Sequence, residues 1–145
     1  MATSDLMEFE RKFRQRELLV AECGTWNLSV RPAQLTLGSM VLAAASGALS
    51  MAELSARERD DMGRGFALAE RLAKQAFGAN RINYLCLMMQ DPIVHFHVLP
   101  RYADPLERFG VRWRDADWPG PPHVVPVSTG DDTLRRIRDA LLEAL

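Results

Sequence analysis

Two of the chain's three histidines stand two residues apart in the apolar segment IVHFHVLPRY, residues 93–102. If this segment is a β-strand, its side chains alternate between two faces, and His95 and His97 project from the same side. The opposite side carries only apolar residues, which we expect to pack on the core: Val94, Phe96 and Val98. The histidine side is then predicted to be the open face, available for chemistry.

Two imidazoles on one face allow three interpretations. Both can be half-exposed residues without a chemical role. They can instead share a metal ion, although zinc needs a further ligand, for which His123 and Asp91 are the available candidates. In the third interpretation, one neutral imidazole attacks phosphorus while the other donates hydrogen bonds to phosphate oxygens or to the leaving group. A same-face pair followed by Arg101 favours a chemical role over none.

The chain before the histidine segment predicts a helix packed on an antiparallel sheet. Ser55 and Glu58 have the spacing of a capping box, and Gly78 is the expected C-cap. One apolar stripe of this helix should face the sheet: Met62, Phe66, Ala69, Leu72, Ala73 and Ala76. Residues 82–89 have the composition of a buried strand. The turn QDP at 90–92 should join it to the histidine strand as an antiparallel hairpin.

The remaining segments complete a predicted α+β domain. Helical spacing of apolar residues predicts a short amphipathic helix from about residue 4 to residue 20, before Gly24. Strands are predicted at 25–30 and 38–46, and a loop-like segment after Arg101 leads to a closing helix. That helix begins at about Asp132, and its apolar side is Leu134, Ile137, Leu141 and Leu142. No repeat or linker divides residues 1–145, so we expect one domain.

Composition excludes several classes of partner. Eighteen basic residues against 19 acidic ones give a net charge of −1, so no electrostatic footprint for nucleic acid or an anionic membrane exists. No apolar run approaches the roughly 20 residues of a membrane span, and no signal-peptide core is present. Cys23 and Cys86 lack metal-binding spacing, which predicts reduced thiols. We therefore expect a soluble, cytoplasmic protein without nucleic-acid or membrane partners.

The motif HFHVLPR and the order of elements around it resemble the histidine triad (HIT) superfamily. Three further segments match that family: LGSMVLAA its Gly-led strand, LSARERDDM the start of its long helix, and MQD the residues before the motif in the fragile histidine triad branch. The resemblance covers about residues 25–102, whereas 103–145 share only a WPGP-like segment with divergent bacterial members. It implies a HIT-like α+β fold, an antiparallel sheet packed with one long helix and shorter terminal helices.

The family's chemistry is nucleotidyl transfer, and alignment of the motif implies that His95 is the nucleophile and His97 the third histidine. The position of the first histidine is Ile93, so the triad is incomplete and we expect a slow enzyme. The substrate would be a nucleotide or dinucleotide, cleaved at the α-phosphate of an ester, anhydride or amidate without a metal or other cofactor. The resemblance also implies a homodimer. The residues expected to contact substrate are Gln90, Arg101, Arg31, Ser29 and Val41.

Two departures from the family pattern leave alternatives open. Ile93 cannot form a hydrogen bond, and QDP is shorter than the family's Gly-rich turn that contacts phosphate. A HIT-fold protein that binds nucleotide without turnover is therefore one alternative, and a metal site formed by His95 and His97 is the other. His123, in the loop WPGPPH, has no assigned role.

Overall fold

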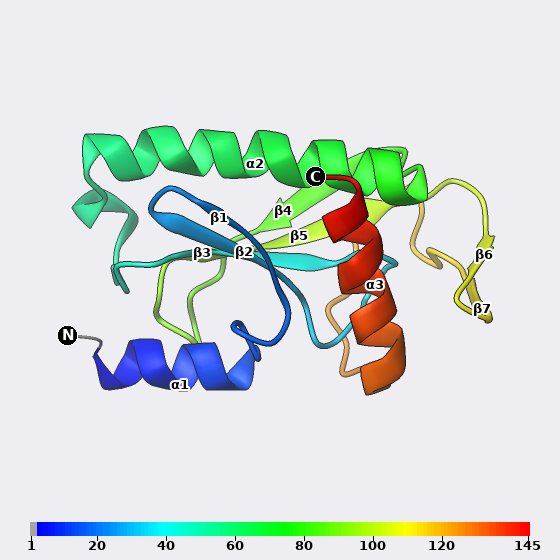
Figure 1. Cartoon of the computed structure of the whole chain (residues 1–145), viewed down its shortest axis with the longest axis horizontal. Helices are drawn as coiled ribbons and strands as arrows, with labels where there is room; N and C mark the ends of the chain where they lie inside the picture. Colours follow the sequence, from blue (N-terminus) through cyan, green and yellow to red (C-terminus); the bar gives the residue numbers. More distant parts are fainter. Residues whose placement is uncertain (1–2) are drawn as a thin grey trace.

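The computed structural model describes residues 3–145 and has an α+β fold built on a five-stranded antiparallel sheet (Figure 1). The strand order is β1-β2-β3-β5-β4. The strands are β1 Leu19–Cys23, β2 Trp26–Val30, β3 Met40–Ala44, β4 Arg81–Leu85 and β5 His95–Arg101. A separate hairpin comprises β6 Leu106–Arg108 and β7 Val111–Trp113. The helices are α1 Ser4–Lys12, α2 Ala56–Phe77 and α3 Asp131–Glu143, with a 3-10 turn at Met51–Glu53. The predicted fold class is confirmed.

The long helix α2 has the ends that its sequence predicts. The Ser55 side chain accepts a hydrogen bond from the Glu58 amide, and the Glu58 carboxylate accepts one from the Ser55 amide. Gly78 ends the helix in the left-handed conformation, at a φ of 70°. The helix packs its small and apolar residues on one face of the sheet, where Trp26 and Leu42 are fully buried. Val94 and Val98 belong to this same core, as predicted.

The opposite face of the sheet is covered by α1, which lies on the other side of the sheet from α2 in Figure 1. This helix ends at Lys12, well before the predicted end near residue 20. The chain leaves the helix at Arg14, whose φ is 50°, and β1 begins at Leu19. Leu18, which we expected on the helix, is instead buried in the core beneath α2. Neither β1 nor the β6–β7 hairpin was predicted.

The predicted pairing of β4 with β5 is confirmed, and it is antiparallel, with Leu85 opposite His97 and Arg81 opposite Arg101. The connection is longer than a three-residue turn, however, because β4 ends at Leu85 and residues 86–94 form a loop. β4 is also an edge strand and only half-buried, in place of the buried strand expected from its composition.

The closing helix α3 is confirmed, with Leu134, Ile137 and Leu141 in the core; Leu142, predicted on the same apolar side, is 39% exposed. No helix in the described part of the chain is long and apolar enough to cross a membrane.

Candidate active site

The sheet register places the two histidines on the α1 side. His97 lies opposite Val41 of β3, and Val41 lies opposite Ser29 of β2, so these three side chains form one row across the sheet. His95 lies opposite Ala43 in the adjacent row. Directly opposed residues point to the same face of a sheet, so the predicted common face of the two histidines is confirmed.

That face is not open, contrary to our prediction, because α1 packs against it. The ring of Phe9 contacts His95 edge-on, with 4.9 Å between the ring centroids, and Phe13 lies 5.9 Å from both imidazoles. His95 is only 2% exposed. Ile93, at the position of the missing histidine, is fully buried in an apolar cluster with these two phenylalanines.

Hydrogen-bond partners assign opposite tautomers to the two imidazoles. Nδ1 of His95 lies 2.5 Å from the Ile93 carbonyl oxygen, which can only accept, so this nitrogen carries the proton and Nε2 has a free lone pair. Nδ1 of His97 accepts a hydrogen bond of 3.1 Å from Nε of Arg31, so in the neutral ring the proton is on Nε2. The ring centroids are 5.0 Å apart. The pair therefore presents one free lone pair and one N–H donor.

Both imidazoles are held in the neutral form. Burial lowers the pKa of His95, and this effect outweighs the hydrogen bond to the Ile93 carbonyl, which acts to raise the pKa. Burial also lowers the pKa of His97, to about 4, and the positive charge of Arg31 adds to this effect. A nucleophilic imidazole must be unprotonated, so both shifts favour a nucleophile at neutral pH.

A cavity of about 600 Å³ opens beside the histidines. Its polar lining includes both imidazoles, Arg31 and Gln90, and its apolar lining includes Phe13. Further apolar lining comes from two loops, with Leu87, Met88 and Met89 from one and Val124 and Pro126 from the other. Lys12, at the end of α1, lines the cavity and forms an ion pair of 2.8 Å with Asp91 of the 86–94 loop. This volume is in the range of small-molecule sites.

Four of the predicted site residues meet at this cavity: His95, His97, Arg31 and Gln90. Ser29 and Val41 share the sheet row of His97 but are fully buried and are not among the residues that line the cavity. The Ser29 hydroxyl has no hydrogen-bond partner in the described part of the chain.

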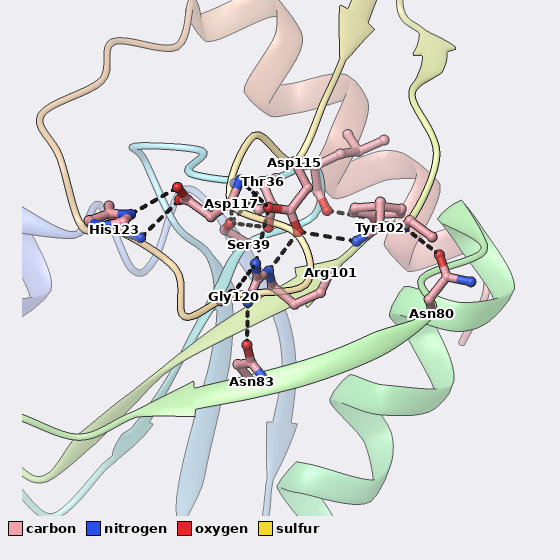
Figure 2. Close-up of polar contacts among 12 residues, drawn as sticks. Thr36, Ser39, Asn80, Asn83, Arg101, Tyr102, Asp115, Asp117, Gly120 and His123 are labelled. Carbon is pink, nitrogen blue, oxygen red and sulfur yellow. Dashed lines mark hydrogen bonds and ion pairs between the residues drawn. The ribbon is translucent and has the colours of Figure 1, made fainter.

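Arg101 is not among the residues that line the cavity, so the structure does not bring this predicted phosphate contact together with the histidines. It lies four residues beyond His97, which is about 13 Å along a strand. Its guanidinium forms a buried ion pair of 2.6 Å with Asp115 and also donates to Asn83 and to the Gly120 carbonyl (Figure 2). Arg101 therefore fixes the loop after β7 to the sheet.

His123 is outside the cavity lining as well. Its exposed ring contacts the Asp117 carboxylate at 2.8 Å, as Figure 2 shows. Its neighbour Val124 does line the cavity. In residues 3–145 no group of three or more His, Cys, Asp or Glu side chains is arranged to hold a metal ion. Neither His123 nor Asp91 therefore completes a metal site with the two histidines.

Sequence reasoning missed the contribution of α1 and the residue that follows it, namely Phe9, Lys12 and Phe13. Helical spacing predicts that both phenylalanines lie on the apolar side of the N-terminal helix, but it does not specify which face of a sheet that helix will cover. Asp91, which binds Lys12, was considered only as a metal ligand.

Comparison with known proteins identifies the fold to which this site belongs. No family model and no curated protein matches the chain. Solved structures do match, among them several histidine triad or HIT-like proteins. A Bartonella henselae HIT-like protein involved in cell-cycle regulation has a TM-score of 0.71 at 15% identity, covering 95% of each chain. A Sinorhizobium meliloti histidine triad protein has a TM-score of 0.69 at 20% identity, covering 91% of this chain and 93% of that one.

A hypothetical histidine triad nucleotide-binding protein from Sulfolobus tokodaii has a TM-score of 0.71 at 12% identity, covering 98% of this chain and 91% of that one. The chain therefore has the histidine triad fold, as its motif predicts. The identities are low, so the likeness concerns the fold.

Proposed function

We propose that the protein is a nucleotide hydrolase or nucleotidyltransferase that cleaves its substrate at the α-phosphate through a nucleotidyl-histidine on His95. The observation that supports this best is the pair of opposite tautomers at one cavity, a free Nε2 on His95 beside an Nε2–H donor on His97. A histidine triad fold and the nucleotide-binding description of one structural neighbour agree with it.

The proposed reaction has two steps. Nε2 of His95 attacks the α-phosphorus, so that a phosphorus–nitrogen bond forms while the bond to the leaving group breaks. The departing oxygen or nitrogen takes up a proton from solvent, while Nε2–H of His97 donates a hydrogen bond to it or to a phosphate oxygen. Water, or another acceptor, then attacks phosphorus. The phosphorus–nitrogen bond breaks, Nε2 of His95 regains its lone pair, and the acceptor loses its proton to solvent. Neither step uses a metal.

Charge at the cavity supports a phosphate ligand. Arg31 remains cationic although burial lowers its pKa. Within the described chain, its Nε donates a hydrogen bond to His97 and its Nη1 donates one to the Ala33 carbonyl. Nη2 is thus left to donate to a phosphate oxygen. Gln90 offers an amide donor from the 86–94 loop. Lys12 is neutralised locally by Asp91, so Arg31 supplies the net positive charge of the lining.

The test is turnover of adenylyl and guanylyl amidates and dinucleoside polyphosphates by the wild type, His95→Ala and the matched control His123→Ala. We expect His95→Ala to abolish turnover and the covalent nucleotidyl adduct seen by intact-mass spectrometry, with nucleotide affinity retained. His123→Ala should behave like the wild type because His123 is outside the cavity. Turnover by His95→Ala at the wild-type rate would contradict the proposal.

One structural feature favours the alternative of a HIT-fold protein that binds nucleotide without turnover. His95 is 2% exposed beneath Phe9, and Ile93 gives it no polar side-chain support. Calorimetric binding of a nucleotide without turnover of any substrate in the panel would select this alternative. Stoichiometric zinc in native mass spectra, lost on mutation of either histidine, would select the metal site instead, and EDTA should otherwise leave activity unchanged.

We also propose a homodimer in the cytoplasm. β4 ends the sheet, and its outer edge has no strand partner among the described residues, so a second copy could pair or pack there. Cys23 and Cys86 are free thiols, which suits a reducing compartment. Light scattering on purified protein measures the oligomeric state directly, and a monomer at micromolar concentration would contradict the dimer.

A further inference from the structure

Arg31 follows β2 directly and donates three hydrogen bonds within the described chain. Its backbone amide donates to the Ser39 carbonyl at 2.9 Å, and Nη1 donates to the Ala33 carbonyl at 2.6 Å. The remaining bond runs from Nε to Nδ1 of His97, at 3.1 Å. A guanidinium is planar and rigid, so fixing Nη1 on Ala33 also fixes the direction in which Nε donates.

The chemistry of this contact restricts the protonation of His97. A guanidinium has N–H donors only, so its partner nitrogen must have a free lone pair. Protonated His97 would direct an N–H at the N–H of Arg31, and the Nδ1–H tautomer of neutral His97 would do the same. Only the neutral Nε2–H tautomer satisfies Arg31.

We infer that Arg31 is a positioning residue, which holds His97 in the neutral Nε2–H tautomer so that this nitrogen donates toward the cavity. His95 obtains its own tautomer from the Ile93 carbonyl, a backbone group that any residue at 93 would supply. The two imidazoles of this incomplete triad are thus oriented by one carbonyl and one arginine, without a third histidine. The effect of Arg31 on catalysis rests on the proposed function, whereas its effect on the tautomer of His97 is independent of that function.

Other charged groups act on the same imidazole. His95, Asp91 and Lys12 all influence His97 electrostatically, in addition to Arg31. Lys12 lines the same cavity but donates to Asp91. Replacing Lys12 therefore removes a positive charge from the cavity without removing the hydrogen bond to His97, and this separates the charge of Arg31 from its hydrogen bond.

The first experiment measures imidazole ¹⁵N shifts in the wild type, Arg31→Met and Lys12→Met, which report the tautomer of each histidine. The wild type should show His97 as Nε2–H and His95 as Nδ1–H at neutral pH. Arg31→Met should give His97 a mixture of tautomers and a higher pKa. The Nδ1–H tautomer of His95, which depends on the Ile93 carbonyl, should be retained and is the check that the fold persists. Lys12→Met should retain the wild-type tautomers.

If the wild-type protein showed His97 in the Nδ1–H form, that result alone would overturn the inference. An Arg31→Met protein with the tautomer and pKa of His97 unchanged would overturn it as well.

The second experiment is the pH profile of kcat with an adenosine phosphoramidate. Arg31→Met should lower kcat by about tenfold to a hundredfold, as expected for a lost orienting hydrogen bond, and should shift the acid limb of the profile to higher pH. A change in KM alone, with kcat and the acid limb unchanged, would overturn the positioning role. A wild type without turnover would contradict the proposed function, and the tautomer measurement would then decide the inference alone.

Discussion

The ring of Phe13 lies 5.9 Å from the imidazole of His95 and 5.9 Å from that of His97, measured between centroids. One side chain beyond the end of α1 thus covers both candidate catalytic groups. Burial is the largest cause of the lowered pKa of each imidazole, so the N-terminal segment contributes to their protonation state as well as to packing.

Replacing Phe13 with alanine should therefore raise the pKa of both histidines toward the ordinary value of about 6.5, because water then reaches the rings. The lost packing should lower the free energy of unfolding by about 2–4 kcal/mol. NMR titration of the imidazoles and urea denaturation measure the two effects.

Phe77→Ala is the matched control for this experiment, because Phe77 is 6% exposed, close to the 7% of Phe13, but is the last residue of α2 and packs in the core on the other face of the sheet. It should cost comparable stability and leave the titration of both histidines unchanged. If Phe13→Ala left both pKa values in place while destabilising the fold, α1 would have no electrostatic role at the site.

Stability should depend on pH through His97. Its pKa in the folded protein is about 4, below the ordinary value of 6.5, so the unfolded chain binds the proton more readily. The contribution of neutral His97 to the free energy of unfolding is therefore complete above pH 6.5, and it is lost as the pH falls toward 4.

Between about pH 7.5 and pH 5 the free energy of unfolding should fall by about 1–2 kcal/mol, allowing for the partial exposure of the ring. Urea denaturation at the two pH values measures this difference. His97→Asn keeps an acceptor for Arg31 but does not titrate, so the part of the difference that comes from His97 should disappear. His95, whose pKa is also lowered by burial, still contributes in that variant. An equally large pH dependence in that variant would assign the effect to other groups.

Local signals in the sequence predicted α2 and the common face of the histidines, for different physical reasons. Ser55, Glu58 and Gly78 act on backbone groups within a few residues of themselves, so their effect does not depend on the rest of the fold. The shared face of His95 and His97 follows from strand geometry alone.

Long-range packing was not predictable in the same way. Phe9 covers His95 because of where α1 packs on the sheet. The sequence pattern of α1 predicts only that this helix has an apolar side. Residues 86–89 continue the apolar run of β4, yet Met88 has a φ of 50° and the run leaves the sheet to line the cavity. Apolar composition does not distinguish a buried strand from an apolar cavity wall.

The contact of Arg101 with a distant loop is another long-range feature that the sequence did not predict, and it yields a third prediction. Its partner Asp115 lies in a loop, and both side chains are almost completely buried, at 4% and 2% exposure. Arg101→Met should leave the Asp115 carboxylate buried without its cation and lower the free energy of unfolding by about 3–5 kcal/mol.

The double variant Arg101→Met/Asp115→Leu should recover part of that loss, because no charge is then left unpaired. Nucleotide affinity of the folded single variant should remain that of the wild type, since Arg101 is not part of the cavity lining. A large loss of affinity with normal stability would restore the phosphate-binding role that the motif implied.

The fourth prediction concerns the incomplete triad. Ile93 is fully buried and packs with Leu6, Phe9 and Phe13, and no polar partner for a side chain at this position lies in that cluster. Ile93→His should therefore lower the free energy of unfolding by about 1–3 kcal/mol, the cost of burying a polar group without a hydrogen bond.

Completing the triad in this way should also change the rate of nucleotidyl-histidine formation by less than about tenfold, because the tautomer of His95 depends on the backbone carbonyl at 93, which the substitution retains. Single-turnover kinetics on an adenosine phosphoramidate measure the rate, and Ile93→Leu is the control for altered packing alone. A gain of a hundredfold in Ile93→His, absent in Ile93→Leu, would show instead that an imidazole at this position orients His95 in a way that the carbonyl cannot.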